Sequence, residues 1–241
     1  IVGLDLQTGQ EVWRFHSIAR PDEPGGNTWN NLALKDRSGG SVWVPASYDP
    51  ELDLAYYGTA PTYDTAPLLH SLNEKGVSNE ALYTNATVAL RPRTGELVWF
   101  FQHMPNDQWD LDWVFERQIA ELEVNGVRRK VVLTAGKMAL YDVLDAATGK
   151  YLNSFDVGLQ NIVTAVDPRT GDKIINPRAI PNAEDANLLC PMANAGRNWP
   201  SASINPITKM LYLPLAEICM MFGPTSDTRT LLTTGVAIVP Q

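Results

Sequence analysis

The sequence predicts an all-β repeat protein of the β-propeller type. Three observations lead to this prediction: a hairpin phrase that recurs along the chain, connections rich in Pro, Gly and Asn, and no sustained helical periodicity. The 241 residues have 44% hydrophobic and 19% charged content, an ordinary balance for a globular chain with a sizeable core. A disordered chain is thereby excluded.

The recurring phrase reads strand, tight turn, strand. A polar residue ends the first strand, Thr-Gly or a related pair supplies the turn, and an alternating apolar and polar strand follows. Gly95 lies 86 residues after Gly9, and Gly149 lies 54 residues after Gly95, which suits propeller blades with long insertions better than a uniform solenoid. The clearest copies are LDLQTGQEVWRF (4–15), LRPRTGELVWFF (90–101), LDAATGKYLNSF (144–155) and VDPRTGDKIINP (166–177), with looser copies YDPELDLAYYGT (48–59) and INPITKMLYLPL (204–215).

The connections between these phrases are long. They cover 16–38, 60–80 and 176–200, and long loops on a β scaffold are commonly functional. Within them a short helix is expected near 65–75 or 77–84. We find no linker that would divide the chain, so residues 1–241 are predicted to form a single domain.

Charge and termini narrow the class of protein. The net charge of −8 and a pI near 4.9 argue against a nucleic-acid partner held through phosphate contacts. No run approaches the ~18 apolar residues of a membrane span. The chain opens inside an expected strand, "IVGLDLQTG", without Met or a leader pattern, so we expect it to be a fragment. Cys190 and Cys219 are either a disulfide pair or two buried thiols, and the count alone leaves both open.

The stretch PNDQWDLDWVFER (105–117) combines acidic and aromatic residues. It holds Asp107, Asp110 and Asp112, interleaved with Trp109 and Trp113. If 109–113 is extended, Asp110 and Asp112 point to the same side, which suits a hard cation or a general base. A solvated acidic turn is the alternative, but the tryptophans indicate burial, and a buried carboxylate needs a partner.

Three further stretches are candidates for ligand binding. In GGSVWVPASYDP (39–50), Trp43 is either a flat platform for a planar ligand or a core residue. In TAGKMALYD (134–142), Lys137 is either a charge-neutralising residue or a surface lysine. In AGRNWPSASINP (195–206), Arg197, Asn198 and Trp199 combine donors for a carboxylate with an aromatic, unless they only stabilise the loop. The histidines (16, 70, 103) are scattered and predict neither a zinc site nor a triad.

These stretches occur together in the order of one family. The chain resembles the pyrroloquinoline-quinone (PQQ) dependent dehydrogenases, that is, the quinoprotein alcohol and sugar dehydrogenases. The resemblance covers essentially the whole chain, and its carriers are LDLQTGQEVWRF with PGGNTW, GGSVWVPASYDPELDLAYYGT, LRPRTGELVWFFQHMPNDQWDLD and CPMANAGRNWPSASINPITKMLYLPLAEIC. The WDxD element after a TG-x-x-x-W strand is the most specific of them.

The resemblance implies an eight-bladed propeller of four-stranded antiparallel blades, with PQQ beside a Ca²⁺ or lanthanide ion. This chain would supply roughly four blades of it. The implied site residues are Asp110 as catalytic base and metal ligand, Asp112 as a further metal ligand of lanthanide-type members, and, for PQQ, Ser41, Trp43, Lys137, Asn198 and Trp199. It also implies a disulfide between Cys190 and Cys219.

The implied function is oxidation of an alcohol or sugar hydroxyl by hydride transfer to the quinone, with the proton taken by Asp110 and the metal acting as a Lewis acid. The implied partners are a cytochrome c or membrane quinone as electron acceptor, and the implied location is the periplasm. The pattern departs from the family at Pro61, where an Asn ligand to the metal is usual; Thr62 or Asp64 are possible replacements.

Two other classes of function compete with this interpretation. A non-catalytic propeller that binds proteins would keep the hairpins but would not need WDxD, Trp43 and Asn198 together. A glycosidase would use two of the clustered acids, but would leave the aromatic and amide features without a role. The co-occurrence favours the dehydrogenase.

Overall fold

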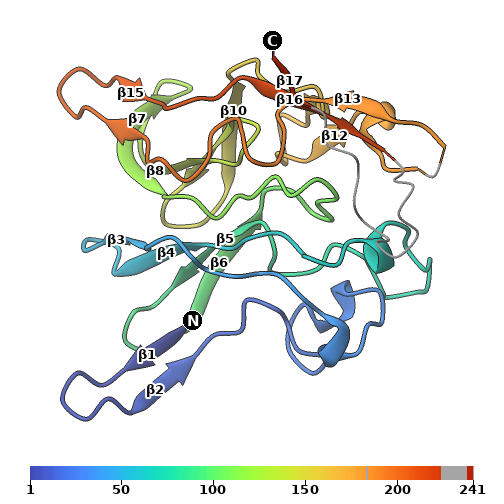
Figure 1. The fold of residues 1–241 in the computed structure, drawn as a ribbon. Coiled ribbons are helices and arrows are strands. Elements are labelled where there is room, and N and C mark those ends of the chain that lie inside the picture. Colours follow the sequence, from blue (N-terminus) through green and yellow to red (C-terminus); the bar gives the residue numbers. More distant parts are fainter. Residues whose placement is uncertain (183, 224–237, 241) are drawn as a thin grey trace.

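A computed structural model describes residues 1–182, 184–223 and 238–240. The described residues form short antiparallel strands and single 3₁₀ turns, so the all-β prediction is confirmed (Figure 1). The strands are β1 (Val2–Leu4), β2 (Glu11–Arg14), β3 (Ser47–Asp49), β4 (Leu54–Gly58), β5 (Ala86–Leu90), β6 (Leu97–Gln102), β7 (Gln118–Val124), β8 (Val127–Ala135), β9 (Leu140–Asp145), β10 (Tyr151–Asp156), β11 (Val163–Val166), β12 (Lys173–Ile175), β13 (Asn187–Leu189), β14 (Ser203–Ile204), β15 (Leu211–Tyr212), β16 (Ile218–Phe222) and β17 (Ile238–Pro240). The 3₁₀ turns are η1 (Gly26–Thr28), η2 (Leu34–Asp36), η3 (Ala66–Leu68) and η4 (Pro177–Ala179).

Two sheets have the form of propeller blades. Strands β3-β4-β5-β6 and β10-β9-β8-β7 each make a four-stranded antiparallel meander. Smaller sheets pair β1 with β2, β11 with β12, β14 with β15, and β13-β16-β17. Figure 1 shows the β1–β2 hairpin beside the first meander and the second meander on its other side. Within the described residues the sheets do not close into a ring.

All the main copies of the recurring phrase form the same turn. At Asp145 the carboxylate accepts from the amides of Ala147 and Thr148 (3.2 and 3.0 Å), and the amide of Gly149 donates to the Asp145 carbonyl (2.8 Å). Gly149 has a φ of 70°, a left-handed conformation that glycine adopts without strain. The same main-chain bonds close the turns that begin at residues 5, 91, 167 and 205.

The turn of one copy receives the aromatic residue of the preceding copy. A Cβ added to Gly95 would lie 2.3 Å from the Trp13 ring, and one added to Gly149 would lie 2.5 Å from the Trp99 ring. Each indole N–H donates to a carbonyl of the same turn, at 2.9 and 3.2 Å. The glycine therefore has a second role besides the turn: without a Cβ, it leaves room for an indole that packs against the turn and links neighbouring sheets.

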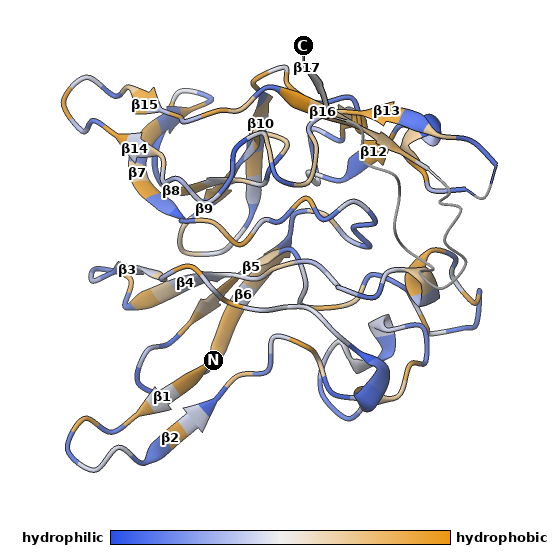
Figure 2. Cartoon of the chain, in the orientation of Figure 1, coloured by the Kyte–Doolittle hydropathy of each residue, from blue (hydrophilic) through white to orange (hydrophobic). Residues whose placement is uncertain are grey.

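The core lies between the sheets. One cluster, between the two meanders, includes Leu54, Tyr56, Trp99 and Leu144. Figure 2 shows strands that are largely hydrophobic and connections that are largely hydrophilic. A second cluster is built on the loop after β6 and contains Trp109, Leu111, Trp113, Met138 and others. Both tryptophans of 105–117 are thus core residues, as the expectation of burial required.

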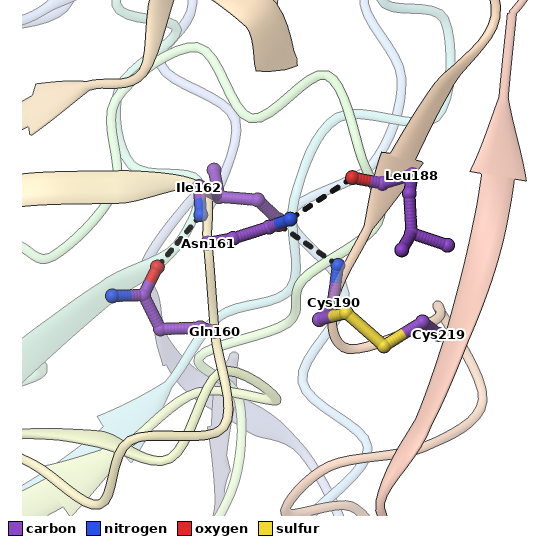
Figure 3. The surroundings of a disulfide bond; sticks show 6 residues. All are labelled: Gln160, Asn161, Ile162, Leu188, Cys190 and Cys219. Atoms are coloured by element: carbon purple, nitrogen blue, oxygen red, sulfur yellow. Dashed lines mark hydrogen bonds between the residues drawn. A yellow bond between two sulfur atoms is a disulfide. The ribbon is translucent and has the colours of Figure 1, made fainter. Parts of the chain in front are cut away.

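The predicted disulfide is present. Cys190 follows β13 and Cys219 lies in β16, two strands that pair, and the bond joins residues 29 apart in sequence. Figure 3 shows that the Asn161 side chain bonds to the segment that leads to Cys190. Its amide oxygen accepts from the Cys190 amide and its nitrogen donates to the Leu188 carbonyl, both at 2.9 Å.

Two local predictions differ from the structure. Of the expected helix near 65–75 or 77–84, only the single turn η3 forms. Residues 109–113 are not extended: they belong to no strand, and Asp110 has a left-handed φ of 60°. None of the described helices has both the length and the hydropathy required to cross a membrane.

Candidate active site

Main-chain contacts bring three of the predicted stretches together. The Lys137 amide, in the turn between β8 and β9, lies 3.2 Å from the carbonyls of both Leu111 and Asp112. The Arg197 amide in turn donates to the Lys137 carbonyl (2.9 Å). Residues 109–113, 137 and 195–199 therefore share one site although they are distant in sequence.

Two glycines permit this close approach. A Cβ on Gly136 would lie 2.7 Å from the carbonyl oxygens of Leu111 and Asp112. A Cβ on Gly196 would lie 1.9 Å from the Lys137 carbonyl oxygen. Contacts below 3 Å to backbone atoms cannot be relieved by a rotamer change, so only glycine fits at both positions.

Lys137 is the centre of the site. Its side chain is nearly fully buried, and Nζ contacts Asp110 Oδ2 (3.1 Å), the Asp110 carbonyl (2.7 Å) and Asp112 Oδ2 (2.6 Å). These contacts use the three donors of an ammonium group. The alternative of a surface lysine is therefore wrong. Asp110 and Asp112 do point to the same place, but because Lys137 gathers them and not because the segment is a strand.

The two carboxylates differ in exposure. The Asp110 side chain is 56% exposed and the Asp112 side chain 9%. Burial raises the pKa of Asp112 above its ordinary value, and the charge and hydrogen bond of Lys137 oppose that rise. Two carboxylates face one ammonium group, so the site keeps an excess of negative charge that suits a cation.

Trp43 lies at a second part of the site and is not a core residue. Trp43 is 46% exposed, and its ring packs edge-on against Phe115, with centroids 5.5 Å apart. Phe115 also contacts Arg197, whose guanidinium lies 4.5 Å from the ring centroid. This arrangement fixes an indole with an open surface. Ser41, two residues before Trp43, shares a hydrogen bond with the hydroxyl of Tyr63.

The loop 195–199 contributes less uniformly than expected. Arg197 is fully buried and bonds to Glu116 and to the Ala135 carbonyl, so it supports the site from inside and is not free for a ligand. Asn198 accepts from the Trp199 amide (2.8 Å), and within the described part of the chain its NH₂ group has no hydrogen bond. Trp199 is 73% exposed. Among the described residues neither Asn198 nor Trp199 has a hydrogen bond or ring contact with Asp110, Lys137 or Trp43.

The residues around Pro61 offer oxygen atoms to a cation or a polar cofactor. Pro61 only offers its carbonyl, which accepts from the Gly40 amide (3.0 Å). Thr62 is buried, and its hydroxyl has no hydrogen-bond partner among the described residues, which leaves a buried acceptor beside the predicted site residues of 39–43. Asp64 is exposed. The unpaired Thr62 hydroxyl and the carboxylate pair are oxygen groups of the type that a hard cation prefers, and the exposed indole suits the planar ring of PQQ. The described residues hold no group of three or more His, Cys, Asp or Glu able to bind a metal by themselves, so the ligand set is partial.

A buried polar chain that the sequence did not reveal lies behind the site. His103 Nδ1 bonds to Asp142 (2.7 Å), its Nε2 bonds to the Thr87 hydroxyl (2.7 Å), and Lys173 pairs with Asp142. Burial lowers the pKa of His103 to about 4, so the ring is neutral at pH 7, donates from Nδ1 and accepts at Nε2. The hydroxyl, imidazole and carboxylate are linked in the same sequence as in a catalytic triad, but these side chains are buried and inaccessible to substrate. The His103 ring stacks on Trp113 at 4.5 Å and so supports the acidic loop.

Two more buried residues have roles that the sequence pattern does not reveal. The sequence identifies Asp107 only as a member of the acidic run and assigns no role to Asn85. Both are buried and bond to each other at 2.8 Å, directly beneath the loop that carries Asp110 and Asp112. The signal in the sequence was the Asn-Asp pair Asn106–Asp107 before a tryptophan, which is common turn chemistry and not specific to a site.

The meanders, their indole-filled turns and the carboxylate–lysine cluster define a propeller-type protein with an acidic site in its inter-strand loops. Over residues 1–157 the chain matches the family model described as "PQQ: Glucose/ethanol/alcohol dehydrogenase, beta-propeller domain". The chain belongs to this family, which confirms the resemblance found in the sequence.

Individual relatives agree with this assignment. The chain is 32% identical over 230 residues to the quinohemoprotein alcohol dehydrogenase ADH IIB of Pseudomonas putida, covering 90% of this chain and 32% of the relative. It is 28% identical over 238 residues to the dehydrogenase subunit of the alcohol dehydrogenase (quinone) of Komagataeibacter europaeus, covering 92% of this chain and 32% of the relative. The chain thus spans about a third of the length of the curated relatives it matches.

Solved structures show the same fold. The quinohemoprotein alcohol dehydrogenase ADHIIG of Pseudomonas putida HK5 matches with a TM-score of 0.81 at 29% identity, over 94% of this chain and 35% of that one. A europium-containing methanol dehydrogenase matches with a TM-score of 0.76 at 24% identity, over 93% of this chain and 42% of that one, which shows a shared fold alone.

Proposed function

We propose that this protein takes part in the PQQ-dependent oxidation of an alcohol or sugar hydroxyl, with metal assistance and with Asp110 as general base. The observation that carries the proposal is the convergence of Asp110 and Asp112 on the buried ammonium group of Lys137. The named activities of the relatives, alcohol dehydrogenases of the quinone and quinohemoprotein types, support it.

Each candidate residue has a role that its surroundings support. Trp43 offers an open indole surface for stacking, and Ser41, Lys137, Asn198 and Trp199 lie on the stretches that would hold PQQ. Asp110 and Asp112 would ligate Ca²⁺ or a lanthanide, with the Thr62 hydroxyl as a further oxygen donor. When bound, PQQ supplies the electron acceptor and the cation supplies Lewis-acid polarisation.

Asp110 is suited to accept a proton. Lys137 contacts only Oδ2 of its carboxylate, and among the described residues nothing donates to Oδ1. One oxygen is therefore oriented by Lys137, and the side chain as a whole is 56% exposed, so a substrate hydroxyl can reach it.

The remaining parts of the proposal concern the whole protein. Residues 1–241 would be one partial propeller domain of roughly four blades. The electron acceptor would be a cytochrome c or a membrane quinone, and the location the periplasm. One relative of 28% identity, from Pseudomonas sp., is named lupanine 17-hydroxylase [cytochrome c], which supports a cytochrome partner.

The test is dye reduction by the full-length protein, supplied with PQQ and either Ca²⁺ or La³⁺, with primary alcohols and sugars as substrates. We expect turnover that requires PQQ and is lost in Asp110→Asn. Absence of both turnover and PQQ binding with either metal would reject the enzyme and favour a protein-binding propeller.

The role of Asp112 is tested in the same assay. Asp112→Ala is expected to reduce lanthanide-dependent turnover more than Ca²⁺-dependent turnover, because a lanthanide ion needs more anionic oxygen ligands. Asp5→Asn, in the turn of the β1–β2 hairpin, is the matched control and should have no effect. Equal loss with both metals would contradict the role assigned to Asp112.

A further inference from the structure

We propose that Asp107 and Asn85 are positioning residues, a buried clamp that shapes the loop 107–113 so that Asp110 and Asp112 both reach Lys137. Its part in turnover rests on the proposed function, whereas its part in shaping the loop does not. Neither residue lies on a surface that substrate can reach, since the exposed fraction of each is at most 1%.

Asp107 accepts three hydrogen bonds, two from amides of this loop and one from the Asn85 side chain. Its Oδ1 accepts from the Trp109 amide (2.8 Å), and its Oδ2 accepts from the Leu111 amide (2.7 Å) and from the side-chain nitrogen of Asn85 (2.8 Å). All three groups bonded to this buried carboxylate are donors. The set therefore suits a carboxylate, which only accepts, better than an amide, whose nitrogen would face a donor.

Asn85 continues the clamp and anchors it to the scaffold. Its side-chain oxygen accepts from the Trp113 amide (3.0 Å). Its own amide donates to the Ala60 carbonyl (3.1 Å), and its carbonyl accepts from the His103 amide (2.8 Å). The clamp is thus fixed between the segment after β4 and the segment after β6.

The loop alternates between the clamp and Lys137. The amides of Trp109, Leu111 and Trp113 are taken by the clamp, and the residues between them, Asp110 and Asp112, send their carboxylates to Lys137 Nζ. No strand pairing could produce this arrangement, because Asp110 has a φ of 60°. A non-glycine residue keeps that conformation only where its surroundings hold it.

A purely structural clamp would stabilise the fold without affecting the site. A positioning role can be distinguished from a purely structural role because positioning affects the orientation of the Asp110 and Asp112 carboxylates. Loss of orientation should lower kcat while KM changes little, and it should also release Lys137 from its carboxylates.

The variants are Asp107→Asn and Asp107→Ala. In Asp107→Asn the side-chain nitrogen must face at least one of the three donors, so at least one hydrogen bond is lost. In Asp107→Ala all three are lost. Asp5→Asn is the control, because Asp5 also accepts three hydrogen bonds in a turn, far from the site.

Two readouts are measured on the full-length protein: kcat and KM with PQQ and metal, and the acetylation rate of Lys137 by acetic anhydride, followed by mass spectrometry. Lys173, buried in the separate pair with Asp142, is the internal control for unfolding. In Asp107→Asn we expect kcat to fall about tenfold or more with KM within about twofold, and Lys137 acetylation to rise about fivefold. Both effects should be larger in Asp107→Ala, and Asp5→Asn should match the wild type.

Unchanged kcat and unchanged Lys137 acetylation in Asp107→Asn would overturn the proposal, as would equal rises at Lys137 and Lys173. If Asp107→Asn does not fold, hydrogen exchange in the wild type tests whether the clamp holds the loop. The Leu111 and Trp113 amides should then exchange as slowly as those of β5, although they lie in no strand, and fast exchange would reject the clamp. If the wild type has no PQQ-dependent turnover, the proposed function fails, while acetylation still tests the clamp.

Discussion

The disulfide between Cys190 and Cys219 provides a quantitative test of the fold. Replacing both residues by Ala should lower the free energy of unfolding. The bond closes a loop of 29 residues. In the chain-entropy model, a loop of this length removes about 12 cal/mol/K from the unfolded chain, or about 3.6 kcal/mol at 25 °C. For a chain of this size, that corresponds to a fall in Tm of roughly 7–14 °C.

Urea unfolding followed by tryptophan fluorescence measures this loss. The wild type treated with a reductant is the matched control, because it lacks the cross-link but keeps both side chains. Reduced wild type and the double Ala variant should lose similar stability with the same dependence on urea. Losses below ~1 kcal/mol, or a loss in the Ala variant alone, would show that packing and not loop closure accounts for the contribution of the two cysteines.

Three further predictions concern buried groups of the site. Because the pKa of His103 is lowered to about 4 in the folded protein, the unfolded chain binds its proton first; stability should fall between about pH 6.5 and pH 4, by up to about 3 kcal/mol, and urea unfolding of His103→Gln across this range should lack that share. Lys137→Met should leave Asp112 buried without its ion partner and destabilise the fold by ~3 kcal/mol in the same assay, and an unchanged midpoint would contradict the buried pair. Gly196→Ala should cost at least ~2 kcal/mol, since its Cβ would meet the Lys137 carbonyl at 1.9 Å and φ is 64°; a thermal midpoint equal to that of the wild type would refute this close approach.

The turns were predictable because their chemistry is local. Asp145, Thr148 and Gly149 lie within five residues and bond to one another, so the same phrase gives the same hairpin wherever it occurs. The disulfide and the site residues followed from the resemblance. Their grouping around Lys137 could not be derived from spacing, and the extended form considered for 109–113 does not occur, because the hydrogen bonds of buried Asp107 hold this segment in another conformation.

The acidic and aromatic stretch 105–117 separates the two kinds of information. The sequence by itself determined the all-β hairpin repeats, the burial of Trp109 and Trp113, and the presence of carboxylates that need a partner. Only the tertiary structure decided that the partner is Lys137, that Asp107 bonds to the amides of its own loop, and that Asn85, just before β5, and His103, just after β6, support this loop. The physical reason is distance along the chain: turn chemistry acts between neighbouring residues, whereas a buried charge is satisfied by whichever donor the packing of separate sheets brings within ~3 Å.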